Sequence, residues 1–122
     1  AGTCVLARRD TSEKASVALN DVLSKVPVLL EVIQGEMLAR AQDHLAAHIS
    51  EASDLEEMIK ILDEKGGFVK APWGGTELDE KKIQDKTKAT IRVVSETKLD
   101  KPGKCIFTGN ETDTVVYFAR AY

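Results

Sequence analysis

Two histidines four residues apart are the first side chains in this sequence that could share a metal ion. His44 and His48 fall in a stretch whose apolar residues recur at helical spacing, so both imidazoles would project from one helix face. Leucine and alanines separate them, so the glutamate that acts as general base in the helical metalloprotease motif is missing. The sequence therefore favours a solvated helix face over a small metalloenzyme, which would also need a third ligand.

The stretch KCIFTGNET, residues 104–112, has the pattern of half a structural zinc site that lacks its second cysteine. Its thiol, Cys105, is far in sequence from the only other cysteine, Cys4, so the chain has no disulfide framework and fits a reducing compartment. A nucleophilic thiol needs surroundings that lower its pKa, and neither histidine is spaced to lie nearby. We therefore expect a structural or vestigial cysteine.

Two further groups of residues could bind anions. Gly74 and Gly75 precede an expected helix start, where free amides can hold a phosphate, but no lysine follows at P-loop spacing. A turn and a capped helix are the favoured interpretation. A basic run beside that helix could contact a tRNA backbone, although such runs are usually solvated. The run consists of Lys81, Lys82, Lys86 and Lys88.

Composition limits the classes of function that the chain can have. Its 122 residues suit one domain, or one small domain with part of another. The formal net charge of −3 disfavours a free-standing nucleic-acid binder, because such proteins need a basic surface. No apolar run is long enough for a membrane span, and the N-terminus is not a signal peptide. The missing initiator methionine suggests a fragment of a longer cytoplasmic protein.

The elements that must position these residues begin with a strand over 3–8. Asp10 and Glu13 have the spacing of a capping box, which predicts a helix whose apolar stripe continues to residue 26. Pro27 lacks an amide proton, so we expect this helix to break or kink there. A longer helix is predicted from about 28 to 49.

The second half of the chain predicts a mixture of helices and strands. Ser53 with Glu56 suggests a capping box for a helix that ends at Gly66 and Gly67, where glycine allows a left-handed turn. The later elements are listed in chain order. They are a strand over 68–72, a helix opened by Thr76 and Asp79 and ending near 86, a strand over 89–94, a loop over 95–104, and a hairpin that pairs 104–107 with 113–122.

This order predicts an α+β fold, specifically a two-layer α/β sandwich with a small mixed sheet, preceded by a helical connector. The aromatic residues Trp73, Tyr117, Phe118 and Tyr122 are expected to pack in its core or at an interface. No set of residues supplies a nucleophile, a base and an oxyanion site together. The chain alone is therefore not expected to be an enzyme.

Four ordered segments resemble the C-terminal part of prolyl-tRNA synthetase of the archaeal and eukaryotic type. They are LARRDTSEK, EEMIKILDEKGGFVKAPWGG, KATIRV and VVYFARAY, and the match is colinear over essentially the whole chain. The resemblance implies that residues 1–50 are the end of the anticodon-binding domain and connector helices. Residues 51–122 would then be the extra C-terminal domain.

The resemblance also implies what the parent protein does. Such a parent is a class II synthetase that activates proline with ATP and Mg²⁺ and transfers it to tRNA(Pro), and it is expected to be a homodimer. Its ATP- and proline-binding motifs would lie upstream, so this part would hold no cofactor and its partners would be the rest of the synthetase and tRNA. The alternative is a stand-alone RNA- or protein-binding module without ligase activity.

The family pattern implies two further expectations about single residues. Its four zinc-binding cysteines correspond here to Gly74, Asp79, Cys105 and Thr108, and tetrahedral zinc takes four Cys or His ligands, so we predict that no zinc binds. The family's final tyrosine, here Tyr122, is carried back toward the active site with its carboxylate near the substrate pocket. The alternative for Tyr122 is that a core strand simply ends there.

Overall fold

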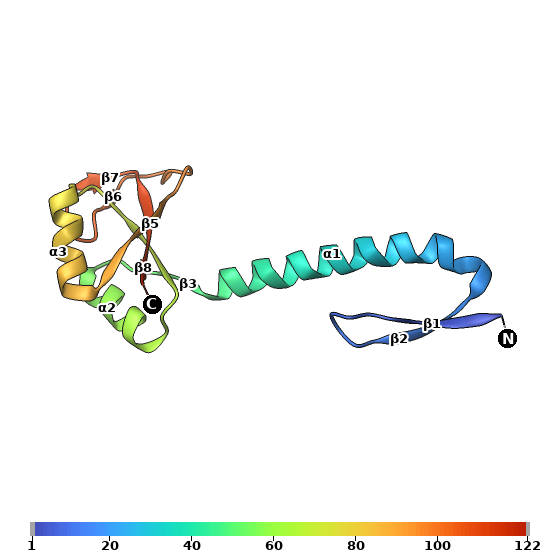
Figure 1. Cartoon of the computed structure of the whole chain (residues 1–122). Coiled ribbons are helices and arrows are strands. Elements are labelled where there is room, and N and C mark those ends of the chain that lie inside the picture. The colour runs from blue at the N-terminus through green and yellow to red at the C-terminus, as the bar shows by residue number, and fades with distance from the viewer. Residues whose placement is uncertain (1, 122) are drawn as a thin grey trace. The chain divides into compact units, whose positions relative to one another are not determined.

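The computed structural model describes residues 2–121 and divides the chain into two compact units. The first unit ends at His44 and the second begins at Leu45. Figure 1 shows the elements of both, from the blue N-terminal hairpin to the red C-terminal strand. None of the helices between residues 2 and 121 combines the length and apolarity that crossing a bilayer requires.

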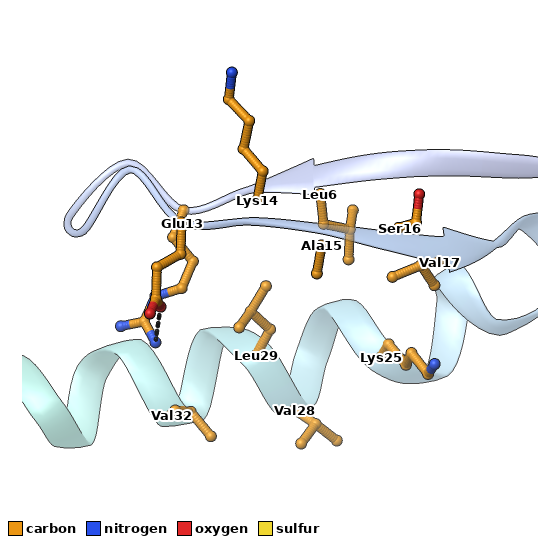
Figure 2. Close-up of a pocket in the computed structure, with 11 residues that line it drawn as sticks. Leu6, Glu13, Lys14, Ala15, Ser16, Val17, Lys25, Val28, Leu29 and Val32 are labelled. Atoms are coloured by element: carbon orange, nitrogen blue, oxygen red, sulfur yellow. Dashed lines mark ion pairs between the residues drawn. The ribbon is translucent and has the colours of Figure 1, made fainter.

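The first unit is a hairpin followed by a long helix. Strand β1 (Thr3–Ala7) pairs antiparallel with β2 (Lys14–Ala18), and a 3₁₀ turn, η1 (Leu19–Asp21), leads into α1 (Val22–Ala47). Because β2 alternates polar and apolar residues, one of its faces is turned to α1 and the other to solvent (Figure 2).

The helix predicted to start at Asp10 is wrong, because residues 8–13 form the turn of this hairpin. The amide of Arg8 donates to the carbonyl of Glu13 at 2.8 Å, and the amide of Ser12 donates to the carbonyl of Arg8 at 2.9 Å. The Asp10 carboxylate binds the Arg8 guanidinium instead of capping a first helical turn.

The break predicted at Pro27 is also wrong. Helix α1 runs through Pro27 without interruption, so the helix predicted over 28–49 begins at Val22 and ends at Ala47. A proline removes one backbone donor, and in this 26-residue helix that loss does not end the helix.

The second unit is built on a mixed four-stranded sheet. Its strand order is β3-β4-β8-β5, where β3 is Ile49–Glu51, β4 is Phe68–Pro72, β8 is Val115–Arg120 and β5 is Ala89–Val94. The β3–β4 pair is parallel, whereas β8 pairs antiparallel with both β4 and β5. The helices are α2 (Leu55–Glu64) and α3 (Glu77–Thr87), and the predicted α+β fold is confirmed.

The core lies between the two helices and one face of this sheet. Residues two apart in a strand share a face, and the buried strand residues Val69 and Ala71 of β4, and Val116 and Phe118 of β8, follow that spacing. The helices contribute Met58 and Leu62 of α2 and Ile83 of α3 to the same apolar cluster. Two layers around one core therefore hold this unit together.

Side-chain caps determine where the two helices begin. The box predicted at Ser53 and Glu56 is wrong: Asp54 is the N-cap and its side chain accepts the Glu57 amide at 2.8 Å, while Glu57 accepts the amide of Ser53, the residue before the cap. The box predicted at Thr76 and Asp79 is confirmed at the start of α3. The residues after α2, Gly66 and Gly67, have the predicted left-handed φ of +67° and +78°.

The hairpin predicted between 104–107 and 113–122 is wrong. A short ladder instead joins β6 (Gly103–Lys104) to β7 (Glu111–Thr112), and residues 106–108 form a turn. Strand β8 pairs with β4 on one edge from Val115 to Phe118 and with β5 on the other, and these two strands take the place predicted for residues 104–107.

Candidate functional site

Cys105 begins the tight turn that the sequence suggested as half of a zinc site. Its amide donates to the Asn110 carbonyl at 2.7 Å, and its sulfur accepts the Thr108 amide at 3.5 Å. Burial acts to raise the pKa of this thiol, but hydrogen bonds from Thr108 and from the amides of Thr108, Gly74 and Phe107 outweigh it, so the pKa lies below its ordinary value. Sequence reasoning missed this environment because backbone amides carry no residue-type signal.

The structure brings three of the four predicted positions together around this sulfur. The Gly74 and Thr108 amides approach Cys105, but Gly74 has no side-chain donor and a hydroxyl is a poor zinc ligand. An added Cβ at Gly74 would lie 3.1 Å from the Thr112 Cβ. The residues present therefore do not fit a tetrahedral zinc site, and the absence of zinc stays a prediction.

The carboxylate at the fourth position, Asp79, already accepts hydrogen bonds from Thr76 and Lys82. Its Oδ2 accepts the Thr76 amide and hydroxyl, both at 3.0 Å, and its Oδ1 accepts from Lys82 Nζ at 3.3 Å. Hydrogen bonds from the Thr76 amide, then its hydroxyl and then Lys82 hold the pKa of Asp79 below its ordinary value. Because the capping box already binds the amides of Thr76 and Asp79, few amides at this helix start are left to bind an anion.

Direct contacts hold the turn after β4 in place. The Thr112 hydroxyl donates to the Trp73 carbonyl at 2.8 Å, and the Trp73 ring meets Phe118 edge-on with centroids 5.7 Å apart. A Cβ at Gly75 would lie 2.7 Å from the Trp73 ring, so only glycine lets the chain pass it. Packing and hydrogen bonds thus join the turn to β7 and β8.

The histidines and lysines do not form a shared site among residues 2–121. Helix α1 ends at Ala47, so His44 lies in the helix and His48 beyond it, and no group of three potential metal-ligating side chains occurs in that range. In the basic run, Lys82 pairs with Asp79, and Lys86 Nζ lies 5.8 Å above the Phe107 ring. A tRNA contact by these lysines stays a prediction.

The first unit carries an apolar cleft of about 740 Å³ between the hairpin and α1 (Figure 2). Leu6, Ala15 and Val17 line it from the hairpin, and they face side chains from α1. The α1 residues are Val28, Leu29 and Val32. Val28 keeps 63% and Val32 42% of its surface exposed, so this cleft is an open apolar face that the described residues leave uncovered.

A charged cluster closes one end of the same unit. The Asp10 carboxylate binds the Arg8 guanidinium at 2.8 Å and that of Arg40 at 3.1 Å, and Arg8 also binds Glu36. The Arg8 bond, followed by the Arg40 bond, holds the pKa of Asp10 well below its usual range despite desolvation, which acts to raise it. Two side chains of α1 are thereby tied to the hairpin turn.

The C-terminal residue singled out by the sequence, Tyr122, lies outside the described residues. Strand β8 ends two residues earlier at Arg120, whose guanidinium reaches Asp63 Oδ1 at 2.7 Å and the Thr87 carbonyl at 2.7 Å. This strand thus ends against the C-terminal ends of both helices of the unit.

Comparisons with known proteins connect this arrangement to one family. The family model "Prolyl-tRNA synthetase, C-terminal" matches residues 55–122. Proline–tRNA ligases from Christiangramia forsetii and Flavobacterium johnsoniae are 42% and 41% identical to the chain, each over 99% of it and 25% of the relative. The chain therefore spans about a quarter of the length of these curated relatives.

A solved structure has the same fold. A crystal structure of prolyl-tRNA synthetase from Cryptosporidium parvum, complexed with L-proline and AMP, superposes with a TM-score of 0.90. The superposed region covers 99% of this chain and 26% of the synthetase chain. At 23% sequence identity, this similarity shows the fold alone.

Proposed function

The chain belongs to the prolyl-tRNA synthetase C-terminal family, and from this we propose that it is the C-terminal accessory part of a proline–tRNA ligase. The observation that carries the proposal is the match of residues 55–122 to that family, extended over 99% of the chain by the ligase relatives. Those relatives are about four times longer, which disfavours the alternative of a stand-alone RNA- or protein-binding module.

The chemistry belongs to the parent chain. The parent activates proline with ATP and Mg²⁺ in the cytoplasm and charges tRNA(Pro), and it acts as a homodimer. The part described here supplies no nucleophile or cofactor site, and its partner is the remainder of the synthetase. Its role is structural, with one extension toward the active site at Tyr122.

The first unit is proposed to complete the anticodon-binding domain, within the predicted segment 1–50. A two-stranded hairpin with one helix cannot bury a core of its own, and Val17 is the only buried apolar residue between residues 2 and 44. Eight of the twelve exposed large apolar residues among residues 2–121 also fall there. They are Val5, Leu19, Leu23, Val28, Leu30, Val32, Met37 and Leu38.

We propose that the part of the synthetase that precedes residue 1 covers these exposed side chains. The matched family is C-terminal and the chain spans a quarter of its relatives, so most of the synthetase would lie before residue 1. The cleft between the hairpin and α1 then becomes the interior of a larger domain. Residues 51–122 form the extra C-terminal domain, whose own core is already closed.

The test uses the full-length protein with Tyr122 intact, deleted, or replaced by Phe. We expect the intact protein to charge tRNA(Pro) with proline, and the deletion to lower kcat by roughly tenfold to a hundredfold with unchanged Tm, since small losses of positioning are costly. The variant Tyr122→Phe keeps the ring and carboxylate and should retain activity.

Each failure has a separate meaning. An intact protein that charges another amino acid, or none, would refute the ligase assignment. Full activity after the deletion would refute only the role of Tyr122 and leave the domain as an architectural brace.

A further inference from the structure

Arg120 joins the last strand to the ends of both helices in the second unit. Its Nε donates to the Thr87 carbonyl at 2.7 Å, and one terminal nitrogen donates to the Leu62 carbonyl at 3.4 Å. The other terminal nitrogen pairs with Asp63 Oδ1 at 2.7 Å. One side chain therefore contacts three acceptors on two separate elements.

These acceptors suit a guanidinium in particular. Thr87 is the last residue of α3 and Leu62 lies in the last turn of α2, where carbonyls have no partner within the helix. The C-terminal end of a helix is also partly negative, which favours a cation. Only arginine presents several donors in one rigid plane, whereas lysine has a single flexible ammonium.

The contacts come where the strand itself is held on one side only. Strand β8 pairs with β4 from Val115 to Phe118, but its last two residues, Ala119 and Arg120, pair only with β5. The Arg120 side chain supplies the second point of attachment at this end. It is 34% exposed, so the Asp63 ion pair by itself contributes little and the two carbonyl contacts set the geometry.

We propose that Arg120 is a positioning residue, which fixes the direction in which the chain leaves β8 so that Tyr122 is presented to the active site of the synthetase. The inference rests on the proposed function of Tyr122. Without this anchor the last two residues of β8 are held only by their pairing with β5.

The test is a double-mutant cycle in the full-length synthetase, measured by proline-dependent pyrophosphate exchange and by tRNA charging. The variants are Arg120→Gln, the Tyr122 deletion and the two combined, with Tm recorded for each. Asp63→Asn is the matched control, because it removes the exposed ion pair and keeps both carbonyl acceptors. Arg120→Lys retains the charge with fewer donors.

We expect Arg120→Gln to lower kcat/KM for proline by about tenfold or more, with KM for tRNA unchanged. The combined variant should be no worse than the Tyr122 deletion, since both act through the same residue. Asp63→Asn should behave as the unmodified enzyme, and Arg120→Lys should be intermediate.

Four results would overturn the inference. Arg120→Gln could lower Tm and leave kcat/KM unchanged at temperatures well below Tm, which would show that Arg120 contributes only to stability. The losses in kcat/KM from Arg120→Gln and from the Tyr122 deletion could instead add in the combined variant, which would mean that Arg120 acts independently of Tyr122. If the Tyr122 deletion leaves kcat/KM for proline unchanged, the proposed roles of Tyr122 and Arg120 are both wrong. If the deletion lowers kcat/KM but Arg120→Gln does not, only the proposed role of Arg120 is wrong.

Discussion

Cys105 shows how hydrogen bonds from backbone amides can satisfy a buried thiol. The residue is 3% exposed, and its sulfur accepts hydrogen bonds from the amides of Thr108, Gly74 and Phe107. Such bonds stabilise negative charge on sulfur, as a cation would, and they explain why the thiol pKa is lowered despite burial. The turn around Cys105 is therefore held by the backbone.

The residue-scale prediction concerns zinc. Metal analysis of the purified chain should find no stoichiometric zinc, and a chelator should leave Tm unchanged, since Gly74 and Thr108 provide no strong ligand. A structural zinc contributes on the order of 10 kcal/mol, so its removal would be unmistakable. Cys105→Ala is the control variant. Stoichiometric zinc that disappears in Cys105→Ala would contradict the prediction.

At the scale of elements, the hairpin and α1 are joined by charged side chains at one end, and an open apolar cleft lies between them. Arg8 and Asp10 of the turn are nearly covered, with 11% and 12% of their side-chain surfaces exposed, and they bind Glu36 and Arg40 of α1. Beside this cluster the apolar side chains of Figure 2 line the cleft. The Asp10–Arg40 and Arg8–Glu36 ion pairs thus link the turn to the helix, and the Asp10 carboxylate takes part in the first and also binds Arg8.

The element-scale prediction follows from the lowered pKa of Asp10. A carboxyl whose pKa is lower in the folded than in the unfolded state stabilises the fold above its unfolded pKa, and this stabilisation is lost as the pH falls. We expect the hairpin to loosen from α1 progressively below about pH 4, the ordinary range for aspartate. During an acid titration followed by NMR, the carboxyl chemical shift would report protonation of Asp10, and the amide chemical shifts would report loosening of the hairpin.

Two variants make this titration decisive. Asp10→Asn should be loosened already at pH 7 and should show a flatter acid response, while Asp43→Asn, an exposed carboxylate of α1, should behave like the unmodified chain. An Asp10 carboxyl that titrates at an ordinary pKa would contradict the prediction.

At the scale of the whole molecule, the two units differ in how completely each buries its apolar residues. The second unit has a closed cluster in which Met58, Val69, Ile83, Val116 and Phe118 are fully buried. The first has Val17 as its one buried apolar side chain within residues 2–44. Local stability follows buried apolar contact, so the units should open independently and with different free energies.

Hydrogen exchange on the 122-residue chain tests this difference. Amides of β4 and β8 should exchange about a hundredfold or more slowly than those of β1 and β2, after correction for intrinsic rates. In the full-length synthetase the hairpin amides should become protected, because preceding chain would cover the cleft. Equal protection of both units in the isolated chain would count against the proposed anticodon-binding domain.

The sequence by itself determined the features that depend on neighbouring residues. Thr76 and Asp79 cap α3 as their spacing predicts, Gly66 and Gly67 turn left-handed after α2, and the order of elements yields the α+β fold. The motifs near Trp73 and at residues 115–122 also sufficed to indicate the family, which the family match confirms.

Tertiary structure decided the choices in which a local pattern had a distant competitor. Asp10 has capping-box spacing, but its carboxylate is bound by Arg40, thirty residues away, and the predicted helix is a hairpin instead. Residues 104–107 could have paired with the last strand, but β4 and β5 occupy both of its edges. The amides around Cys105 and the carbonyls around Arg120 converge from separate elements, and spacing along one chain cannot reveal such convergence because it depends on how the elements pack.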